Sequence, residues 1–165
     1  PQEVEDREAL CHWKLDTMVS SKGQSKGCLA TFVECKTRFY VAIKMDDRTK
    51  DSMFLVISSL YNTLTSKLLK TFTVDRGKEF ACFEQVESEF GIPMYFADAY
   101  AAWQRGSNEN SNGLLREFFP KKTDLAKVTL DKLTEALVLI NNRPRKCLGF
   151  KTPFDMFKHE IKKLI

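Results

Sequence analysis

Apolar and polar residues alternate along the first part of the chain, and this period of two is typical of β-strands. Three alternating stretches follow one another, at residues 13–19, 28–34 and 38–45. A polar stretch with two glycines separates the first two, whereas only three residues separate the second from the third. The short link predicts a hairpin, and the three stretches together predict an antiparallel meander.

Beyond the meander, helical periods alternate with short strand-like runs. The expected elements are a helix over 49–66, a strand over 69–74, a helix over 78–90, a strand over 93–97, a helix from near Asn108, a helix over 130–142 and a last helix from Phe154, with Thr152 as its cap. This order predicts a ribonuclease-H-like α/β fold, in which a five-stranded mixed sheet carries helices on both faces. The first strand would be central and the fourth would lie beside it.

Three acidic residues stand at positions that indicate a ligand site. Asp16 lies inside the first strand, an environment to which Asp is poorly suited. Asp75 follows the fourth strand directly, and ligand sites of parallel sheets lie at such carboxyl ends. Glu109 lies in the first turn of its helix, where the helix dipole alone would also favour an acid. The expected fold brings the three together.

Carboxylates gathered in one place repel one another unless a cation compensates their charge. Oxygen ligands at a partly open site suit Mg²⁺ or Mn²⁺, and two such ions can support an in-line phosphoryl transfer. We therefore expect Asp16, Asp75 and Glu109 to hold two ions. Asp98 is the alternative third ligand, and Glu79 is either a fourth acid or a carboxylate that stabilises the start of its helix.

Five segments in order resemble the insertion-sequence-thirty family of bacterial transposases. They are HWKLDT, FVECKTRFYVAIKM, VDRGKEF, FADAYAAWQRGSNENSNGLLREFFPK and NNRPRKCLGFKTPFDMF. The three acids, in their order, also resemble the DDE triad of transposases and retroviral-type integrases. The chain departs from the family pattern at Lys14, Leu15 and Arg76, where an acidic residue, a glycine and an asparagine are usual.

The resemblance implies the catalytic core of a DDE transposase or integrase. Such an enzyme uses Mg²⁺ or Mn²⁺ to hydrolyse a phosphodiester at a transposon end, and the freed 3′ hydroxyl then attacks target DNA. It implies double-stranded DNA as partner, a homo-oligomer such as a dimer, and a location in the bacterial cytoplasm with the nucleoid. Two alternatives stay open: a nuclease of the same fold that cuts without joining, and a non-catalytic DNA-binding or oligomerisation module derived from a transposase.

Basic residues predict where the DNA lies. The net charge is +4, and the basic excess falls in the last 25 residues. Lys and Arg at the rim of a metal site position DNA through its phosphates. The predicted phosphate contacts are Arg105, Arg116, Lys121, Lys122, Arg143, Arg145 and Lys146. Asn112, one turn after Glu109, is expected either to orient that carboxylate or to touch the DNA backbone.

Residues 1–11 are charged and lack periodicity, so they predict a linker or arm before a catalytic core at residues 12–165. The absence of an initial Met indicates a fragment of a longer protein. No apolar run approaches the roughly 20 residues that a membrane helix needs. The five cysteines contain no CxxC pair, which disfavours a zinc site and favours reduced thiols.

Overall fold

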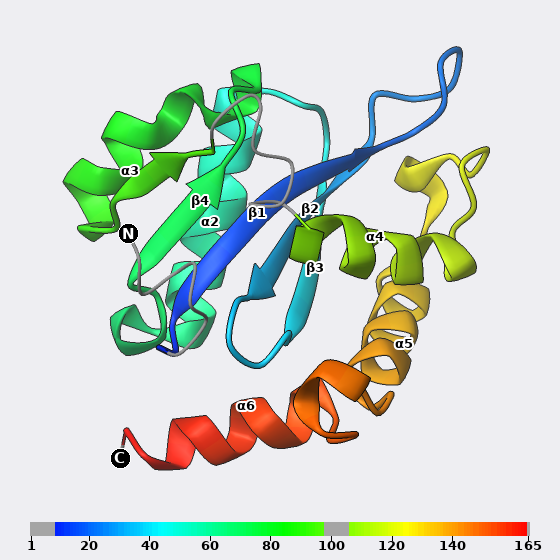
Figure 1. Cartoon of the computed structure of the whole chain (residues 1–165). Helices are drawn as coiled ribbons and strands as arrows, with labels where there is room; N and C mark the ends of the chain where they lie inside the picture. Colours follow the sequence, from blue (N-terminus) through cyan, green and yellow to red (C-terminus); the bar gives the residue numbers. More distant parts are fainter. Residues whose placement is uncertain (1–8, 98–105, 165) are drawn as a thin grey trace.

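The computed structural model describes residues 9–97 and 106–164 (Figure 1). The strands are β1 (His12–Val19), β2 (Cys28–Glu34), β3 (Tyr40–Met45), β4 (Thr71–Val74) and β5 (Met94–Phe96). The α-helices are α2 (Lys50–Leu64), α3 (Phe83–Phe90), α4 (Gly106–Phe118), α5 (Leu130–Asn141) and α6 (Pro153–Lys162). Short 3-10 helices are η1 (Ser66–Leu68), η2 (Lys78–Cys82), η4 (Leu125–Lys127) and η5 (Lys146–Leu148).

The strands form one sheet in the order β3-β2-β1-β4-β5. β1 pairs antiparallel with β2, and β2 pairs antiparallel with β3. The β1–β4 and β4–β5 pairs are parallel. The predicted five-stranded mixed sheet with a central β1 is confirmed. Because β1, β3, β4 and β5 all run in one direction, their carboxyl ends lie at the same edge of the sheet.

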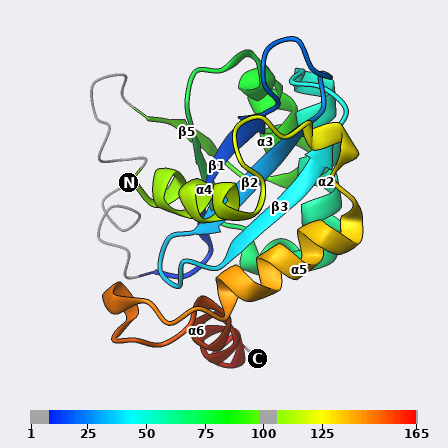
Figure 2. The ribbon, with the colours of Figure 1, turned by 90° about the vertical axis from the view of Figure 1, so that its right-hand side faces the viewer.

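Helices cover both faces of the sheet, as predicted. On one face, Trp13, Phe32 and Phe72 pack in a core under α2 and α3. On the other, Leu29 and Leu115 belong to a second core under α4 and α5, and Figure 2 views the molecule from this side. Every residue of β2 is buried, because a strand covered on both faces leaves none of its side chains in water.

Helix boundaries show where the local prediction differed. The segment expected as one helix over 78–90 begins as the 3-10 helix η2 and becomes α-helical only at Phe83. α4 begins at Gly106, two residues before the predicted start. At the last helix, Thr152 accepts a hydrogen bond from the Asp155 amide at 3.1 Å, which confirms the predicted cap. Within the described ranges, no helix is long and apolar enough to cross a membrane.

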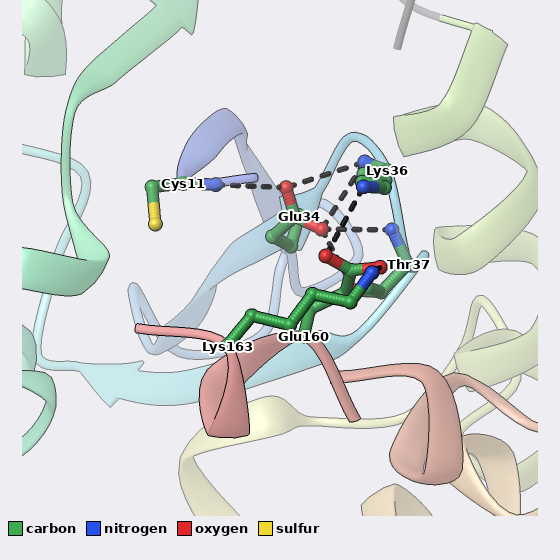
Figure 3. A network of polar contacts seen from close by, with 6 residues as sticks. All are labelled: Cys11, Glu34, Lys36, Thr37, Glu160 and Lys163. Carbon is green, nitrogen blue, oxygen red and sulfur yellow. Dashed lines mark hydrogen bonds and ion pairs between the residues drawn. The ribbon is translucent and has the colours of Figure 1, made fainter. Parts of the chain in front are cut away.

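Helix α6 lies across the end of the sheet where β1 begins (Figure 1). Phe157 stacks on Phe39 with ring centroids 4.3 Å apart and meets Trp13 edge-on at 5.9 Å. Glu160 forms ion pairs with Lys36 on the β2–β3 turn and with Lys163 on its own helix, each at 3.1 Å (Figure 3). Apolar stacking and charge pairing therefore both hold α6 in place, at the edge of the sheet opposite the predicted acids.

Candidate active site

Asp16 and Asp75 lie at equivalent positions of two neighbouring strands. The parallel pairing of β1 with β4 matches Lys14 to Thr73. Asp16 and Asp75 each lie two residues farther along, where the pairing has ended. Since alternate residues of a strand point to the same face, Asp16 and Asp75 share the face covered by α4. Both carboxylates are half-buried at the carboxyl edge of the sheet.

Helix α4 holds Asp16 through Asn112. The Asn112 Nδ2 donates to Asp16 Oδ2 at 3.1 Å, and the backbone amide of Thr17 donates to Asp16 Oδ1 at 2.8 Å. The Tyr40 hydroxyl in turn donates to Asn112 Oδ1 at 2.6 Å. Each oxygen of Asp16 therefore has a fixed donor.

The hydrogen bond from Tyr40 sets the orientation of the Asn112 amide. Burial raises the pKa of Tyr40 far above its ordinary value, so the hydroxyl keeps its proton and acts as a donor. Its acceptor must be Oδ1 of Asn112, and this leaves Nδ2 toward Asp16. Asn112 was expected to orient Glu109 or to touch DNA, whereas in the structure its side chain links Tyr40 to Asp16.

Asp75 closes a tight turn at the end of β4. Its Oδ1 accepts a hydrogen bond from the Gly77 amide at 2.8 Å, a local pattern that Asp commonly forms. A Cβ atom at Gly77 would lie 2.5 Å from Glu79 Oε1, so a larger residue there would displace the Glu79 carboxylate. The turn therefore fixes the Asp75 backbone and brings Glu79 underneath it.

Arg48 is a cation at the same edge. It follows β3, and its Nε donates to Glu79 Oε2 at 2.8 Å. Glu79 is 1% exposed, and Thr17 Oγ1 donates to its other oxygen at 3.4 Å. The hydrogen bond to Glu79 raises the pKa of Arg48, and the negative charges of Asp75 and Asp16 raise it further. One guanidinium thus experiences the charge of all three acids.

Arg48 was absent from the predicted site residues, although the sequence carried a signal for it. In a three-stranded meander the third strand runs parallel to the first, so its carboxyl end reaches the edge that holds Asp16. Arg48 comes three residues after Met45, the last residue of β3. Glu79 was expected to be either a fourth acid or a helix-dipole carboxylate. It lies in the first turn of η2, and its partners are Arg48 and Thr17.

Glu109 lies in the first turn of α4 and is exposed. It precedes Asn112 by three residues, about one helical turn, so the contact of Asn112 with Asp16 brings this part of α4 over the acid pair. Across residues 9–97 and 106–164, no three His, Cys, Asp or Glu side chains form a cluster that could hold a metal ion. The alternative ligand Asp98 and the predicted DNA contact Arg105 lie outside the described residues.

The other predicted DNA contacts fall into two groups. Arg145 is buried, and its guanidinium donates to the carbonyl of Ile140 at 2.9 Å, which argues against a phosphate contact. Arg116 is half-buried and donates to the carbonyl of Val19 at 3.0 Å, so it links α4 to the end of β1. The predicted contacts with exposed or partly exposed side chains are Lys121, Lys122, Lys146 and Arg143, of which Arg143 pairs with Glu117.

Comparison with known proteins identifies the family of this chain. Residues 6–102 match the integrase core domain family. A transposase of Escherichia coli (strain K12), InsI of the insertion sequence element IS30A, is 36% identical over 158 residues. That match covers 96% of this chain and 40% of the relative, so the chain spans less than half of its relative's length. The resemblance to insertion-sequence-thirty transposases is confirmed.

Solved structures show the same fold. The catalytic core domain of BIV integrase superposes with a TM-score of 0.72 at 20% identity, covering 95% of this chain and all of that one. The catalytic core domain of HTLV-2 integrase, solved in complex with magnesium, superposes with a TM-score of 0.67 at 17% identity, covering 88% of this chain and 94% of that one. The match over more than half of the sequence, together with this ribonuclease-H-like sheet, places the chain in the integrase core domain family.

Proposed function

We propose that this chain is the catalytic core of a DNA transposase, which cuts a phosphodiester at a transposon end and joins that end to target DNA. The observation that carries the proposal is the placement of Asp16 and Asp75 at equivalent positions of two parallel strands, with α4 in contact with Asp16. Membership of the integrase core domain family and the similarity to an insertion-sequence transposase support the same reaction.

Asp16, Asp75 and Glu109 are the proposed ligands of two divalent ions, with Asp98 as the alternative to Glu109. Their carboxylate oxygens are hard donors at a partly covered edge, a combination that suits Mg²⁺ or Mn²⁺. The integrase core solved with magnesium supports a divalent ion in this family. When bound, such ions activate the attacking oxygen and stabilise the leaving oxygen of a phosphoryl transfer.

The protein's own part in the reaction is to position charge. Tyr40 and Asn112 keep Asp16 in one orientation, and the turn at Gly77 does the same for Asp75. Arg48 is a cation close to both acids, and it offsets part of the negative charge gathered at this edge of the sheet. Asp16 and Asp75 are therefore already held in place before metal and DNA bind, which lowers the cost of positioning these two acids.

The chemistry consists of two displacements at phosphorus. In the first, water attacks the phosphodiester at the transposon end and the bond to the 3′ oxygen breaks, which frees a 3′ hydroxyl and leaves a 5′ phosphate. In the second, that hydroxyl attacks a phosphorus of target DNA and displaces a 3′ oxygen, which takes up the proton. Neither step needs a covalent protein intermediate. Double-stranded DNA is the partner of both steps, and a homodimer would bring two ends together.

The experiment uses the complete protein that carries this chain, with duplexes of its own element ends and with Mg²⁺ or Mn²⁺. Wild-type protein should cut an intact end and should join a pre-cut 3′ end to target DNA. Asp75→Asn should remove both activities while DNA binding stays. Cutting without joining would favour the nuclease, and metal-dependent nicking that survives in Asp75→Asn would overturn the assignment of the acids. Absence of all cleavage by wild-type protein would favour the DNA-binding module.

A further inference from the structure

A basic pocket lies next to the carboxyl end of β1, and the predicted DNA contacts Arg116 and Lys122 touch residues of its lining. It has a volume of about 380 Å³ and lies between the β1–β2 loop at residues 20–27 and the link from β3 to α2. Its charged lining residues are Lys22, Lys26, Arg48, Lys78 and Asp47. Four cations face one acid there, so the pocket carries a formal charge of +3.

The lysines of the basic pocket come from segments far apart in sequence. Lys26 belongs to the β1–β2 loop, whereas Lys78 follows β4. Hydrogen bonds from Ser52 and Thr49 lower the pKa of Asp47, and the charges of Lys26 and Lys78 lower it further. Lys26 and Lys78 therefore lie around the same carboxylate. Asp47 Oδ1 accepts from both hydroxyls at the start of α2, so this acid also organises the beginning of that helix.

Arg48 joins the basic pocket to the acid pair. Its side chain lines the pocket and is 44% exposed. The hydrogen bond from Nε to the buried Glu79 holds one edge of the guanidinium, and among the described residues Glu79 is its one hydrogen-bonding partner. The terminal N–H groups remain available to an acceptor that enters the pocket. A guanidinium held along one edge presents these donors in the geometry that suits two oxygens of a phosphate.

The β1–β2 loop, which forms one side of the basic pocket, packs against the segment that follows α4. Gln24 Nε2 donates to the carbonyl of Lys122 at 2.7 Å, and Ser20 Oγ accepts from the Leu125 amide at 2.8 Å. A Cβ atom at Gly27 would lie 2.6 Å from Ala126 Cβ, so the loop packs closely against η4. Figure 1 shows the β1–β2 loop beyond the sheet, next to the segment that follows α4. These contacts hold Lys22 and Lys26 on a supported loop.

We propose that the basic pocket binds the phosphate backbone of a DNA strand that extends from the Asp16–Asp75 site, with Arg48 as the contact nearest to those acids. This inference rests on the proposed function, because it assumes that DNA reacts at the acids. The ligand class is the phosphodiester backbone of double-stranded DNA, from either the transposon end or the target. Contacts of Lys and Arg with phosphate give affinity without sequence specificity, and that affinity falls as salt rises.

The test neutralises the lysines and keeps Arg48, since removing Arg48 would leave Glu79 buried without its cation. The variant is Lys22→Gln, Lys26→Gln, Lys78→Gln in the complete protein. The matched control is Lys67→Gln, Lys70→Gln, Lys162→Gln, which removes the same charge from exposed lysines elsewhere. If each pocket lysine neutralises one phosphate, the slope of log K against log salt becomes shallower by about 2 to 3 in the pocket variant. The control keeps the wild-type slope.

Two arms distinguish the source of the strand. A weaker affinity for the element-end duplex alone assigns the pocket to the transposon end. Normal end binding with reduced joining of a pre-cut end, restored by excess target DNA, assigns it to the target. A pocket variant that matches its control in both arms overturns the proposal.

A second measurement needs no substitution. Lysine acetylation of the wild-type protein should fall at Lys22, Lys26 and Lys78 when DNA is added, whereas Lys67, Lys70 and Lys162 stay reactive. Equal protection at both sets overturns the basic pocket as a specific contact. Failure of the proposed function would look different: wild-type protein would show no metal-dependent cleavage, while the acetylation pattern and the salt slope would still report the pocket.

Discussion

Two buried glutamates near opposite ends of β1 show how differently this fold uses a carboxylate. Glu34 is fully buried and lies opposite Trp13, near the start of β1. It accepts hydrogen bonds from the backbone amides of Cys11, Lys36 and Thr37 and from the Thr37 hydroxyl, at 2.7–3.2 Å (Figure 3). All of these donors are close in the fold: Cys11 comes just before β1, and Lys36 and Thr37 lie in the turn that follows Glu34.

Glu79 is equally buried, but it lies at the other end, beside Thr17. Its strong partner is Arg48, a side chain that is 44% exposed and that also experiences the charges of Asp16 and Asp75. Glu34 is thus satisfied by the local chain, whereas Glu79 is satisfied by a cation that faces solvent.

The contrast distinguishes a carboxylate that stabilises the fold from one that can serve a binding site. A carboxylate saturated by backbone amides fixes a turn and has nothing left to offer a ligand. A carboxylate that anchors an exposed cation at a sheet edge presents that cation to whatever binds there. Burial alone does not tell the two apart, because both side chains are at most 1% exposed. The identity and exposure of the partner do.

The largest effect is expected at Asp16, toward the carboxyl end of β1. Asp16→Asn should reduce metal-dependent cleavage by about a thousand-fold or more, as loss of a central catalytic group does. Thermal stability should stay the same or rise slightly, because one of the repelling carboxylates is gone. Parallel cleavage assays and thermal unfolding check both parts. A marked loss of stability would show that Asp16 is a structural residue like Glu34.

At Glu34, near the start of β1, we expect a loss of stability without a loss of metal binding. Glu34→Ala should lower the free energy of unfolding by about 3 kcal/mol, because several buried amide and hydroxyl donors lose their acceptor. Binding of Mn²⁺ at a temperature where the variant is folded should match wild type. Urea unfolding and calorimetry measure the two quantities, with Glu135→Ala on the exposed side of α5 as control. Weakened metal binding in the folded variant would remove the contrast between the two ends.

A smaller effect is expected from the residues that orient Asp16. Asn112→Ala should weaken Mn²⁺ binding by about 10- to 100-fold, the range seen when a group that orients a metal ligand is lost. Tyr40→Phe keeps the buried ring and removes only the hydroxyl that holds Asn112, so its effect should have the same direction and be smaller. Unchanged Mn²⁺ affinity in both variants would show that Asp16 needs no support from α4.

The sequence predicted the sheet and the acid pair because both depend on local pattern. Alternation and strand length identified the strands, and the position of Asp75 at a strand end indicated a site. The contact of Tyr40 with Asn112 joins residues 72 apart and depends on how α4 is rotated over the sheet, which periodicity does not fix. Arg145 was predicted as a phosphate contact from its charge alone. In the structure it is buried, because the carbonyl of Ile140 near the end of α5 accepts a hydrogen bond from its guanidinium.

The smallest effect concerns Glu160, the acid on α6 that pairs with Lys36 and Lys163. Burial raises its pKa, but the two lysines lower it more, so the folded-state pKa lies below the ordinary value of 4.5. The ionised form is therefore favoured by folding, and its stabilisation is present above pH 4.5 and lost as pH falls through the lowered pKa. Because the lysines are partly exposed, Glu160→Gln should cost less than about 1 kcal/mol at neutral pH. Urea unfolding of both proteins at several pH values should show the difference vanish in acid, and a difference that persists there would mean that packing of α6, rather than charge, accounts for it.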